Sequence, residues 1–478
     1  MANLDKTSVR QELDRVKADF EALRTAGKVT PESLAVMNSL FMIVELILAI
    51  FLERTTRKDN RNSSLPSSQT GPDDSALVSG SQGKGKRLDK RNAVNSRTVE
   101  TVSVSTVSTC EVCGESLTDV PCRHHERRTK IDIVFEKVVE HVDAEVKTCP
   151  VCQTMVKGRF PDDLAGPLQY GDGLKAFATN LLVGQMVALN RVQQLIGAMM
   201  DTVIAEATLL NWVLRCHQAL EAWEQQAIEQ LLAAPVMYVD ETSLRVDRKN
   251  QWIHVYAAGS VTLKRLHRKR GKAAIEAIHI IPRYGGVIVH DCWASYFAYE
   301  DCKHGLCGSH LLRELTFIVD AHQYRWAKNM KRLLQETCVQ VSKKEEKCLS
   351  DRELANLQKR YRATLTRGEK ELPPIPPKPS GKRGKIAKSD AHNLWERLKT
   401  HEASVLLFAR HPAVAFTNNR AEQDLRMAKV KQKVSGCFRS EDYAHAYCRI
   451  SSYLQTMANK GYNPLTAIQL ALAGKACE

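Results

Sequence analysis

Val236-Met-Tyr-Val-Asp240 and Gly286-Val-Ile-Val-His-Asp291 are two short apolar runs, and each of them ends on an aspartate. Short apolar runs bounded by turn residues are typical of buried strands. Residues 251–257, which lie between the two runs, alternate in polarity like a third strand. We therefore expect a sheet in which two strands end in aspartate. If those strands are neighbours, both acids face one pocket at the carboxyl ends of the strands.

A third acid lies in a segment that predicts a helix. The segment Asn418-Asn-Arg-Ala-Glu422-Gln-Asp-Leu-Arg426-Met-Ala-Lys429 begins with asparagines, which are typical of a helix start. Spacings of four, three and four place one acid and three cations on a single helical face: Glu422, Arg426, Lys429 and Lys433. An acid on this face can bind metal while the cations hold phosphates on either side of it. This coupling favours Glu422 over Asp424 as the third acid.

Three converging carboxylates suggest phosphoryl-transfer chemistry. Breaking a phosphodiester bond needs little covalent help from a protein, and a few acids can hold two Mg²⁺ ions about 4 Å apart. Asp240, Asp291 and Glu422 are therefore candidate catalytic and magnesium-binding residues. Spacing alone leaves open that the two aspartates are turn residues and that the helical face is simply solvated.

The bulk composition indicates a basic chain of several domains. Its 478 residues include 69 Lys+Arg and 54 Asp+Glu, for a formal charge of +15. This balance favours a polyanionic partner, either nucleic acid or an anionic membrane surface. The N-terminus is polar, with no cleavable signal peptide, and most of the 14 cysteines are scattered singly. We expect a reducing, cytoplasmic setting, where Cys-x-x-Cys pairs bind metal.

Two such cysteine pairs predict a zinc-ribbon domain at residues 109–160. Four thiolates in two knuckles supply a closed tetrahedral shell for one structural Zn²⁺, and the expected ligands are Cys110, Cys113, Cys149 and Cys152. Residues 131–135, between the pairs, have a strand-like sequence. Cys122, His124 and His125 are interpreted as bystanders.

Residues 1–53 predict a coiled-coil hairpin that joins protomers. Apolar residues recur at alternating spacings of three and four, as in a coiled-coil seam: Val9, Leu13, Val16, Phe20 and Leu23. Thr30 and Pro31 can cap a second helix that contains the apolar stretch from Leu34 to Leu52. That stretch is long enough to span a bilayer, but its Glu45 is costly there, so self-association is favoured over membrane insertion.

Three further segments complete the expected domain plan. Residues 54–108 are a basic, flexible linker whose lysines and arginines either contact phosphates or are merely solvated. Residues 161–234 are helical, with a turn at 202–205 before a helix at 206–218, an arrangement compatible either with helix-turn-helix DNA binding or with ordinary helix packing. Residues 313–415 form a helical insertion with a proline-rich loop at 373–379.

Four segments together resemble the DDE transposases of bacterial insertion sequences, specifically the IS66 family. They are Tyr238-Val-Asp240-Glu-Thr-Ser-Leu-Arg245, His290-Asp291-Cys-Trp-Ala-Ser-Tyr296, Leu306-Cys-Gly-Ser-His310-Leu-Leu-Arg-Glu-Leu315 and Thr417-Asn-Asn-Arg-Ala-Glu422-Gln-Asp-Leu-Arg426. The resemblance implies a multidomain α+β protein with an RNase H-like α/β core at 235–312 and 416–478, interrupted by the all-α insertion. It also implies that Asp240, Asp291 and Glu422 bind two Mg²⁺ or Mn²⁺ ions.

The implied activity is that of a DNA transposase. Such an enzyme binds the terminal inverted repeats of its element, cuts the strands and joins them to target DNA. Arg426, Lys429, Lys433 and His310 are the expected DNA contacts, although His310 is equally well explained as a structural residue of the next helix. We expect a homodimer or higher homo-oligomer in the bacterial cytoplasm, associated with the nucleoid and not with a membrane, and leave open a role for accessory transposition proteins. The alternative is a non-catalytic zinc-ribbon DNA-binding regulator derived from a transposase.

Overall fold

The computed structural model describes residues 6–56, 101–133, 136–162, 164, 166–375 and 388–477. These residues form two compact units. The first unit combines the N-terminal helices with Glu224–Cys448, and the second combines the described residues from Thr101 to Trp223 with those from Arg449 onward. Helices and one larger sheet together agree with the expected α+β class. Most of the predicted basic linker and most of the proline-rich loop lie outside the described residues.

The first unit contains a five-stranded mixed sheet in the order β5-β4-β3-β6-β7. Strands β3 (Val236–Val246), β4 (Lys249–Ala258) and β5 (Val261–His267) form an antiparallel meander. Strands β6 (Val287–His290) and β7 (Lys303–Leu306) add to the other edge of β3 in parallel. The two-residue turn between β3 and β4, Asp247-Arg248, has positive φ at both positions, as tight hairpins require.

The prediction that a strand ends at Asp240 is wrong. β3 continues to Val246, because its second half pairs with β4 in an antiparallel hairpin. The parallel pairing of β3 with β6, in contrast, ends before Asp240. Its last pair is Tyr238 with Val289. The prediction for Asp291 is confirmed, since this residue directly follows β6.

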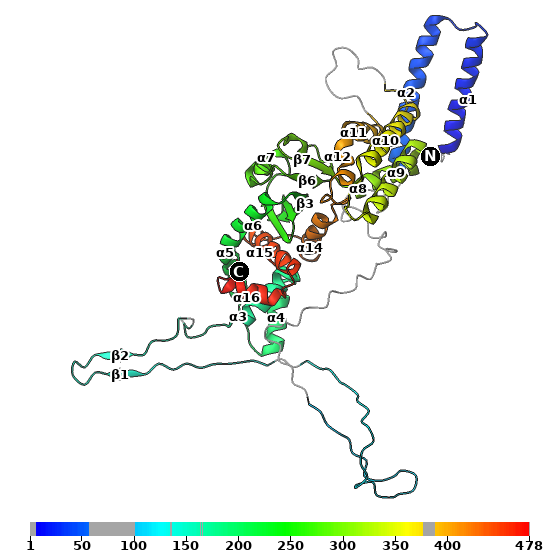
Figure 1. Cartoon of the computed structure of the whole chain (residues 1–478). Helices are drawn as coiled ribbons and strands as arrows, with labels where there is room; N and C mark the ends of the chain where they lie inside the picture. The colour runs from blue at the N-terminus through cyan, green and yellow to red at the C-terminus, as the bar shows by residue number, and fades with distance from the viewer. Residues whose placement is uncertain are drawn as a thin grey trace. The chain divides into compact units, whose positions relative to one another are not determined.

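A set of helices packs beside β6 and β7 (Figure 1). They are α8 (Gly308–His322), α9 (Arg325–Lys343), α10 (Asp351–Glu371), α11 (Asp390–Thr400), α12 (Glu402–Val405) and α13 (Leu407–Arg410). Their apolar faces meet in one core that includes the fully buried Trp326 and Tyr361. The expected helical insertion therefore exists, and it begins a few residues early, because α8 follows β7 almost directly.

The remaining elements of the first unit connect and cover the sheet. α7 (Lys272–Ile278) and the short 3-10 turn η5 (Ile281–Arg283) lead from β5 to β6, and η6 (Tyr296–Ala298) lies between β6 and β7. α14 (Asn419–Ser435), the helix expected to carry the third acid, packs against β3 and β4. α15 (Glu441–Asn459) follows it.

The N-terminal segment forms the expected helical hairpin of α1 (Lys6–Thr25) and α2 (Pro31–Thr55). The Thr30 side chain accepts a hydrogen bond from the Ser33 N–H, which caps α2 as predicted. Phe20 and Phe41 meet edge to face, with ring centroids 5.6 Å apart. The acid within the apolar stretch, Glu45, forms an ion pair with Lys17 of α1, which gives its charge a partner inside the hairpin.

Most of α2 is long and apolar enough to cross a membrane, and little of that stretch is buried. Its exposed apolar side chains follow one another at helical spacing, and they include Val36, Leu40, Ile43, Ile47 and Phe51. The hairpin geometry agrees with the predicted architecture, while self-association through this face stays a prediction.

The second unit contains a small helical core. α3 (Asp172–Thr179), the π-helical turn η4 (Asn180–Gly184), α4 (Leu189–Met200) and α5 (Glu206–Ala219) surround the buried Ile196, Leu209 and Trp212. The predicted helix at 206–218 is thus present. α6 (Glu221–Ala233) follows, and its residues from Glu224 onward belong to the first unit. The C-terminal α16 (Pro464–Leu472) packs on α3 and α5 through buried Ala467, Ile468 and Ala471. We had expected residues 416–478 to belong to the catalytic core, but those from Arg449 onward group with this helical unit.

The region of the paired cysteines carries little regular structure. β1 (Val146–Thr148) and β2 (Met155–Lys157) form an antiparallel hairpin around the second cysteine pair. Within the predicted strand at 131–135, residues 131–133 are exposed and form no strand, and the last two lie outside the described residues.

Candidate active site

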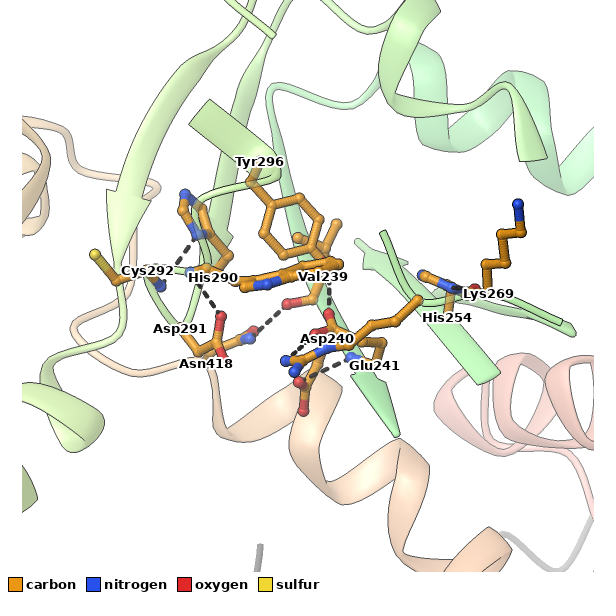
Figure 2. A network of polar contacts seen from close by, with 12 residues as sticks. Val239, Asp240, Glu241, His254, Lys269, His290, Asp291, Cys292, Tyr296 and Asn418 are labelled. Atoms are coloured by element: carbon orange, nitrogen blue, oxygen red, sulfur yellow. Dashed lines mark hydrogen bonds and ion pairs between the residues drawn. The ribbon is translucent and has the colours of Figure 1, made fainter. Parts of the chain in front are cut away.

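Two of the three predicted acids occupy equivalent positions on neighbouring strands. Asp240 and Asp291 each lie two residues beyond the Tyr238–Val289 pair, the last pair of the parallel β3–β6 ladder. The Asp240 Oδ1 accepts a 2.8 Å hydrogen bond from the Glu241 N–H, and the Asp291 Oδ1 accepts a 3.0 Å hydrogen bond from the Trp293 N–H. The parallel register therefore places both acids just beyond the same end of the β3–β6 ladder (Figure 2).

The electrostatic surroundings of Asp240 show an excess of negative charge. Burial raises the pKa of Asp240 well above its usual range, and the charges of Glu241 and Asp291 raise it further. The hydrogen bond from the Glu241 N–H and the charge of His310 oppose this pKa rise. Since like charges in a poorly solvated place need a counter-ion, a bound cation fits this cluster of carboxylates.

The third acid, Glu422, lies in the first turn of α14 and contacts residues from the start of α8. Its Oε1 lies 3.5 Å from His310 Nδ1 and 3.9 Å from Cys307 Sγ. Burial acts to lower the pKa of His310, but the Cys307 sulfur and the charges of Glu422 and Asp291 raise it to about 9. His310 is therefore an electrostatic neighbour of Asp240, Asp291 and Glu422 alike.

The start of α14 is tied to both β3 and α8 by hydrogen bonds. The Asn418 side-chain amide donates to the Val239 carbonyl oxygen at 2.8 Å (Figure 2), and the Asn418 N–H donates to Cys307 Sγ at 3.1 Å. The Gly308 N–H donates to the Phe416 carbonyl oxygen at 2.7 Å. A Cβ on Gly308 would lie about 2.2 Å from the Phe416 ring, so only glycine permits this approach. These contacts bring Glu422 to the sheet.

A fourth acid, Glu241, was missed by the sequence analysis. Its side chain is fully buried, and one carboxylate oxygen accepts two hydrogen bonds from Arg270, at 2.8 and 2.6 Å. The other oxygen accepts a 2.5 Å hydrogen bond from the Tyr296 hydroxyl (Figure 2). The Arg270 guanidinium lies over the rings of Trp293 and Trp252. The available signal was its place beside Asp240 within a strand, because an acid that is buried in a strand requires a partner.

A family model described as the transposase IS66 family matches residues 168–446, which is more than half of the chain. This chain belongs to the IS66 transposase family. No curated protein matches the chain. The match includes β3, β6, the start of α8 and α14, which are the elements that carry the three acids and His310.

A histidine pair supports the β6 end of the site in this IS66-family chain. His290 is buried, and its Nδ1 accepts a hydrogen bond from the Cys292 N–H at 3.1 Å. Its Nε2 donates to His304 Nδ1 at 3.2 Å, because His304 uses its own Nε2 to donate to the Tyr299 carbonyl oxygen. Burial, followed by the charges of His304 and His401, lowers the pKa of His290 well below its usual value. The neutral ring therefore fixes the loop that begins at Asp291.

The basic residues predicted on the Glu422 face have different surroundings. Arg426 and Lys433 are exposed. Lys429 is half-buried, and its ammonium donates to the Ser243 carbonyl oxygen at 2.7 Å and to the Ser243 hydroxyl at 3.2 Å. Asp424 is buried and accepts a 2.8 Å hydrogen bond from Thr262, away from the other acids. The preference for Glu422 over Asp424 stays a prediction.

The two cysteine pairs form matching turns. The Cys110 N–H donates to the Glu115 carbonyl oxygen and the Gly114 N–H donates back to the Cys110 carbonyl oxygen, both at 2.9 Å. The second pair repeats the pattern with Cys149, Thr154 and Gln153 at the same distances. In each turn the residue after the second cysteine has positive φ.

The thiols within each turn interact with one another. A hydrogen bond to Thr154 and then contacts within the turn lower the pKa of Cys152 to about 7, which favours the thiolate that binds metal. Among the described residues, the four sulfurs do not gather in one cluster. Their binding of a shared Zn²⁺ stays a prediction.

Proposed function

We propose that this IS66-family protein is a DDE transposase, in which Asp240, Asp291 and Glu422 carry metal-dependent cleavage and joining of DNA strands. One observation carries the proposal. Acids from three elements far apart in the sequence, β3, the end of β6 and α14, have a common electrostatic neighbour in His310. Chance turn residues and a solvated helix face have no reason to converge in this way.

The sheet supports an RNase H-like core. Three antiparallel strands followed by two strands parallel to the first form a mixed sheet, with the third acid supplied by a helix that packs on it. The insertion of helices α8 to α13 between β7 and α14 agrees with the interrupted core that the family resemblance implies.

The acid cluster fits two Mg²⁺ or Mn²⁺ ions, which Asp240, Asp291 and Glu422 would hold. Carboxylate oxygens are the ligands that these ions prefer. Burial, followed by the charges of Glu241 and Asp291, raises the pKa of Asp240, and a bound cation would offset both effects. Bound ions would supply Lewis acidity, by activating the attacking oxygen and neutralising the leaving oxygen.

The residues of the chain would position the DNA for two in-line displacements. In the first, water attacks the phosphorus at the element's end and the 3′ oxygen leaves as a hydroxyl. In the second, that 3′-hydroxyl attacks a target phosphodiester and expels its 3′ oxygen. Exposed Arg426 and Lys433 would hold the flanking phosphates. His310, with its raised pKa, would carry positive charge beside Glu422. No covalent protein–DNA intermediate is required.

The other parts of the chain would bind and pair the DNA ends. The cysteine turns would form a ribbon around one Zn²⁺, and this ribbon, the helices α4 and α5 and the basic linker would contact the terminal repeats. The α1–α2 hairpin would join two or more protomers in the cytoplasm. A non-catalytic regulator would share these parts but would have no need for the acid cluster.

The deciding experiment is Mg²⁺-dependent cleavage and strand transfer on DNA that carries the element's ends. Asp240→Asn is expected to reduce cleavage by more than roughly 100-fold. Losing a residue that only orients a metal ligand already lowers activity by about 10–100-fold, and Asp240 would be a ligand itself. Asp424→Asn is the matched control and is expected to retain cleavage, since Asp424 bonds to Thr262 instead. Equal cleavage by wild type and Asp240→Asn would defeat the proposal, and DNA binding without any cleavage would favour the regulator.

A further inference from the structure

We propose that Cys307, His310 and Glu422 form a binding site for a soft divalent ion, Zn²⁺, whose occupation withdraws Glu422 from catalysis. The existence of the Zn²⁺ site depends only on the structure. Its inhibitory effect rests on the proposed catalytic role of Glu422. The site is separate from the two cysteine turns, which lie in the other unit of the chain.

The three side chains converge from two helices. Cys307 is the residue that precedes α8, and His310 lies in the first turn of that helix, so one helical turn presents both side chains on the same side. Glu422 comes from the first turn of α14. The Cys307 sulfur, a ring nitrogen of His310 and a Glu422 oxygen all lie within 4.8 Å of one another, close enough for a single ion to reach all three.

Two of the three donor atoms belong to buried groups. His310 Nδ1 is buried and has no hydrogen-bond partner among the described residues, although it faces the Glu422 carboxylate at 3.5 Å. A buried ring nitrogen without a partner is costly, and an ion bound there would satisfy it. Cys307 is also buried, and its sulfur accepts a hydrogen bond from the Asn418 N–H at 3.1 Å.

The ligand set selects the kind of ion. Mg²⁺ prefers oxygen ligands, whereas thiolate and imidazole ligands favour Zn²⁺. One sulfur, one nitrogen and one oxygen give three protein ligands and leave one position for water or a DNA phosphate. Zn²⁺ binds the deprotonated thiol and the neutral imidazole. Glu422 would then ligate Zn²⁺ and be lost to the Mg²⁺ ions of the reaction.

The direct test counts Zn²⁺ ions bound by the full-length chain in competition with a chromophoric chelator. Cys307→Ser and His310→Ala are each expected to bind one ion fewer than wild type. Cys338→Ser, which changes a cysteine on α9, is the matched control and is expected to bind the wild-type number. A full-length Cys149→Ser, Cys152→Ser variant is expected to retain the Cys307 ion.

The second test adds Zn²⁺ to the Mg²⁺-supported cleavage reaction. Zn²⁺ is expected to inhibit wild type, and the half-inhibitory concentration is expected to rise at least about tenfold in a Cys307→Ser chain that still cleaves. If the chain cuts no DNA, the proposed function fails, whereas the ion count still decides the Zn²⁺ site. An unchanged ion count in both Cys307→Ser and His310→Ala, with folding checked by circular dichroism, would overturn the inference.

Discussion

The side-chain amide of Asn418 donates a 2.8 Å hydrogen bond to the carbonyl oxygen of Val239, the residue before Asp240. This bond joins the start of α14 to β3 beside the proposed metal site. Asn418 is buried, so the bond is shielded from water.

Replacing Asn418 should therefore weaken the site without removing a ligand. Asn418→Ala is expected to raise the Mg²⁺ concentration for half-maximal cleavage by roughly 10–100-fold, the usual effect of losing a residue that orients a metal ligand. Titrations of cleavage against Mg²⁺ measure this shift. Asn419→Ala, at the exposed neighbouring position, should leave the Mg²⁺ dependence unchanged. The same Mg²⁺ dependence in both variants would show that this bond does not orient the site.

Tyr296 should contribute to stability through its hydrogen bond to Glu241. Tyr296→Phe leaves one oxygen of a buried carboxylate without its donor, and bonds to charged groups are worth about 1.5–3 kcal/mol. Urea unfolding should show a loss of that size. Tyr443→Phe, which removes a hydroxyl with no partner among the described residues, should change the free energy of unfolding by less than about 0.5 kcal/mol. A Tyr296→Phe chain as stable as wild type would contradict this prediction.

Glu53 should hold the N-terminal hairpin against the helical insertion. Its carboxylate accepts hydrogen bonds from His322 Nε2 at 3.0 Å and from the N–H groups of Asp390 and Ala391 at the start of α11, at 2.6 and 2.9 Å. Glu53→Ala removes the acceptor of these bonds, at about 1–3 kcal/mol for each of the two buried donors, on His322 and Ala391. Amide hydrogen exchange in the last turns of α2 should accelerate accordingly. Glu21→Ala, an exposed change on α1, is the control. Equal amide exchange in the last turns of α2 in the two variants would show that Glu53 does not hold the hairpin.

The free energy of unfolding should fall in mild acid because of His254. Burial lowers the pKa of His254 to about 4, whereas an unfolded histidine titrates near about 6.5. Between these values the unfolded chain binds more protons, so stability is complete above about pH 6.5 and is lost as pH falls toward about 4.

Urea unfolding at several pH values tests this dependence on His254. His254→Gln should flatten the decline of the free energy of unfolding, while His267→Gln, at a more exposed position of the same sheet, should leave it steep. An unaltered slope in the His254→Gln chain would assign the acid sensitivity to other groups.

Arg426 and Lys433 should contribute to DNA binding through phosphate contacts. Each contact adds about 0.9 to the slope of log affinity against log salt, so Arg426→Ala should reduce this slope by about that amount. Lys429→Ala should act mainly on stability, because the Lys429 ammonium already donates to Ser243. Binding isotherms at several salt concentrations separate the two effects. An unchanged salt slope in Arg426→Ala would remove this residue from the DNA-contacting surface.

Local sequence patterns were sufficient for many elements of the structure. The apolar run before Asp291 became β6, and the asparagines at 418 and 419 mark the start of α14. Thr30 and Pro31 begin α2 as predicted, because capping depends on residues within one turn. The end of β3 could not be predicted in this way, since it depends on pairing with β4 as well as on the apolar run.

The sequence by itself determined the family, the basic charge, the paired cysteines and the identity of the three candidate acids. These follow from residue type and spacing along the chain. Only the tertiary structure decided that Glu241 is held by Arg270 and Tyr296, that Cys307 lies beside Glu422, and that the C-terminal helix α16 packs on α3 and α5. The reason is that these contacts join residues far apart in sequence, and their partners are selected by sheet register and by the packing of buried surfaces, neither of which a local pattern contains.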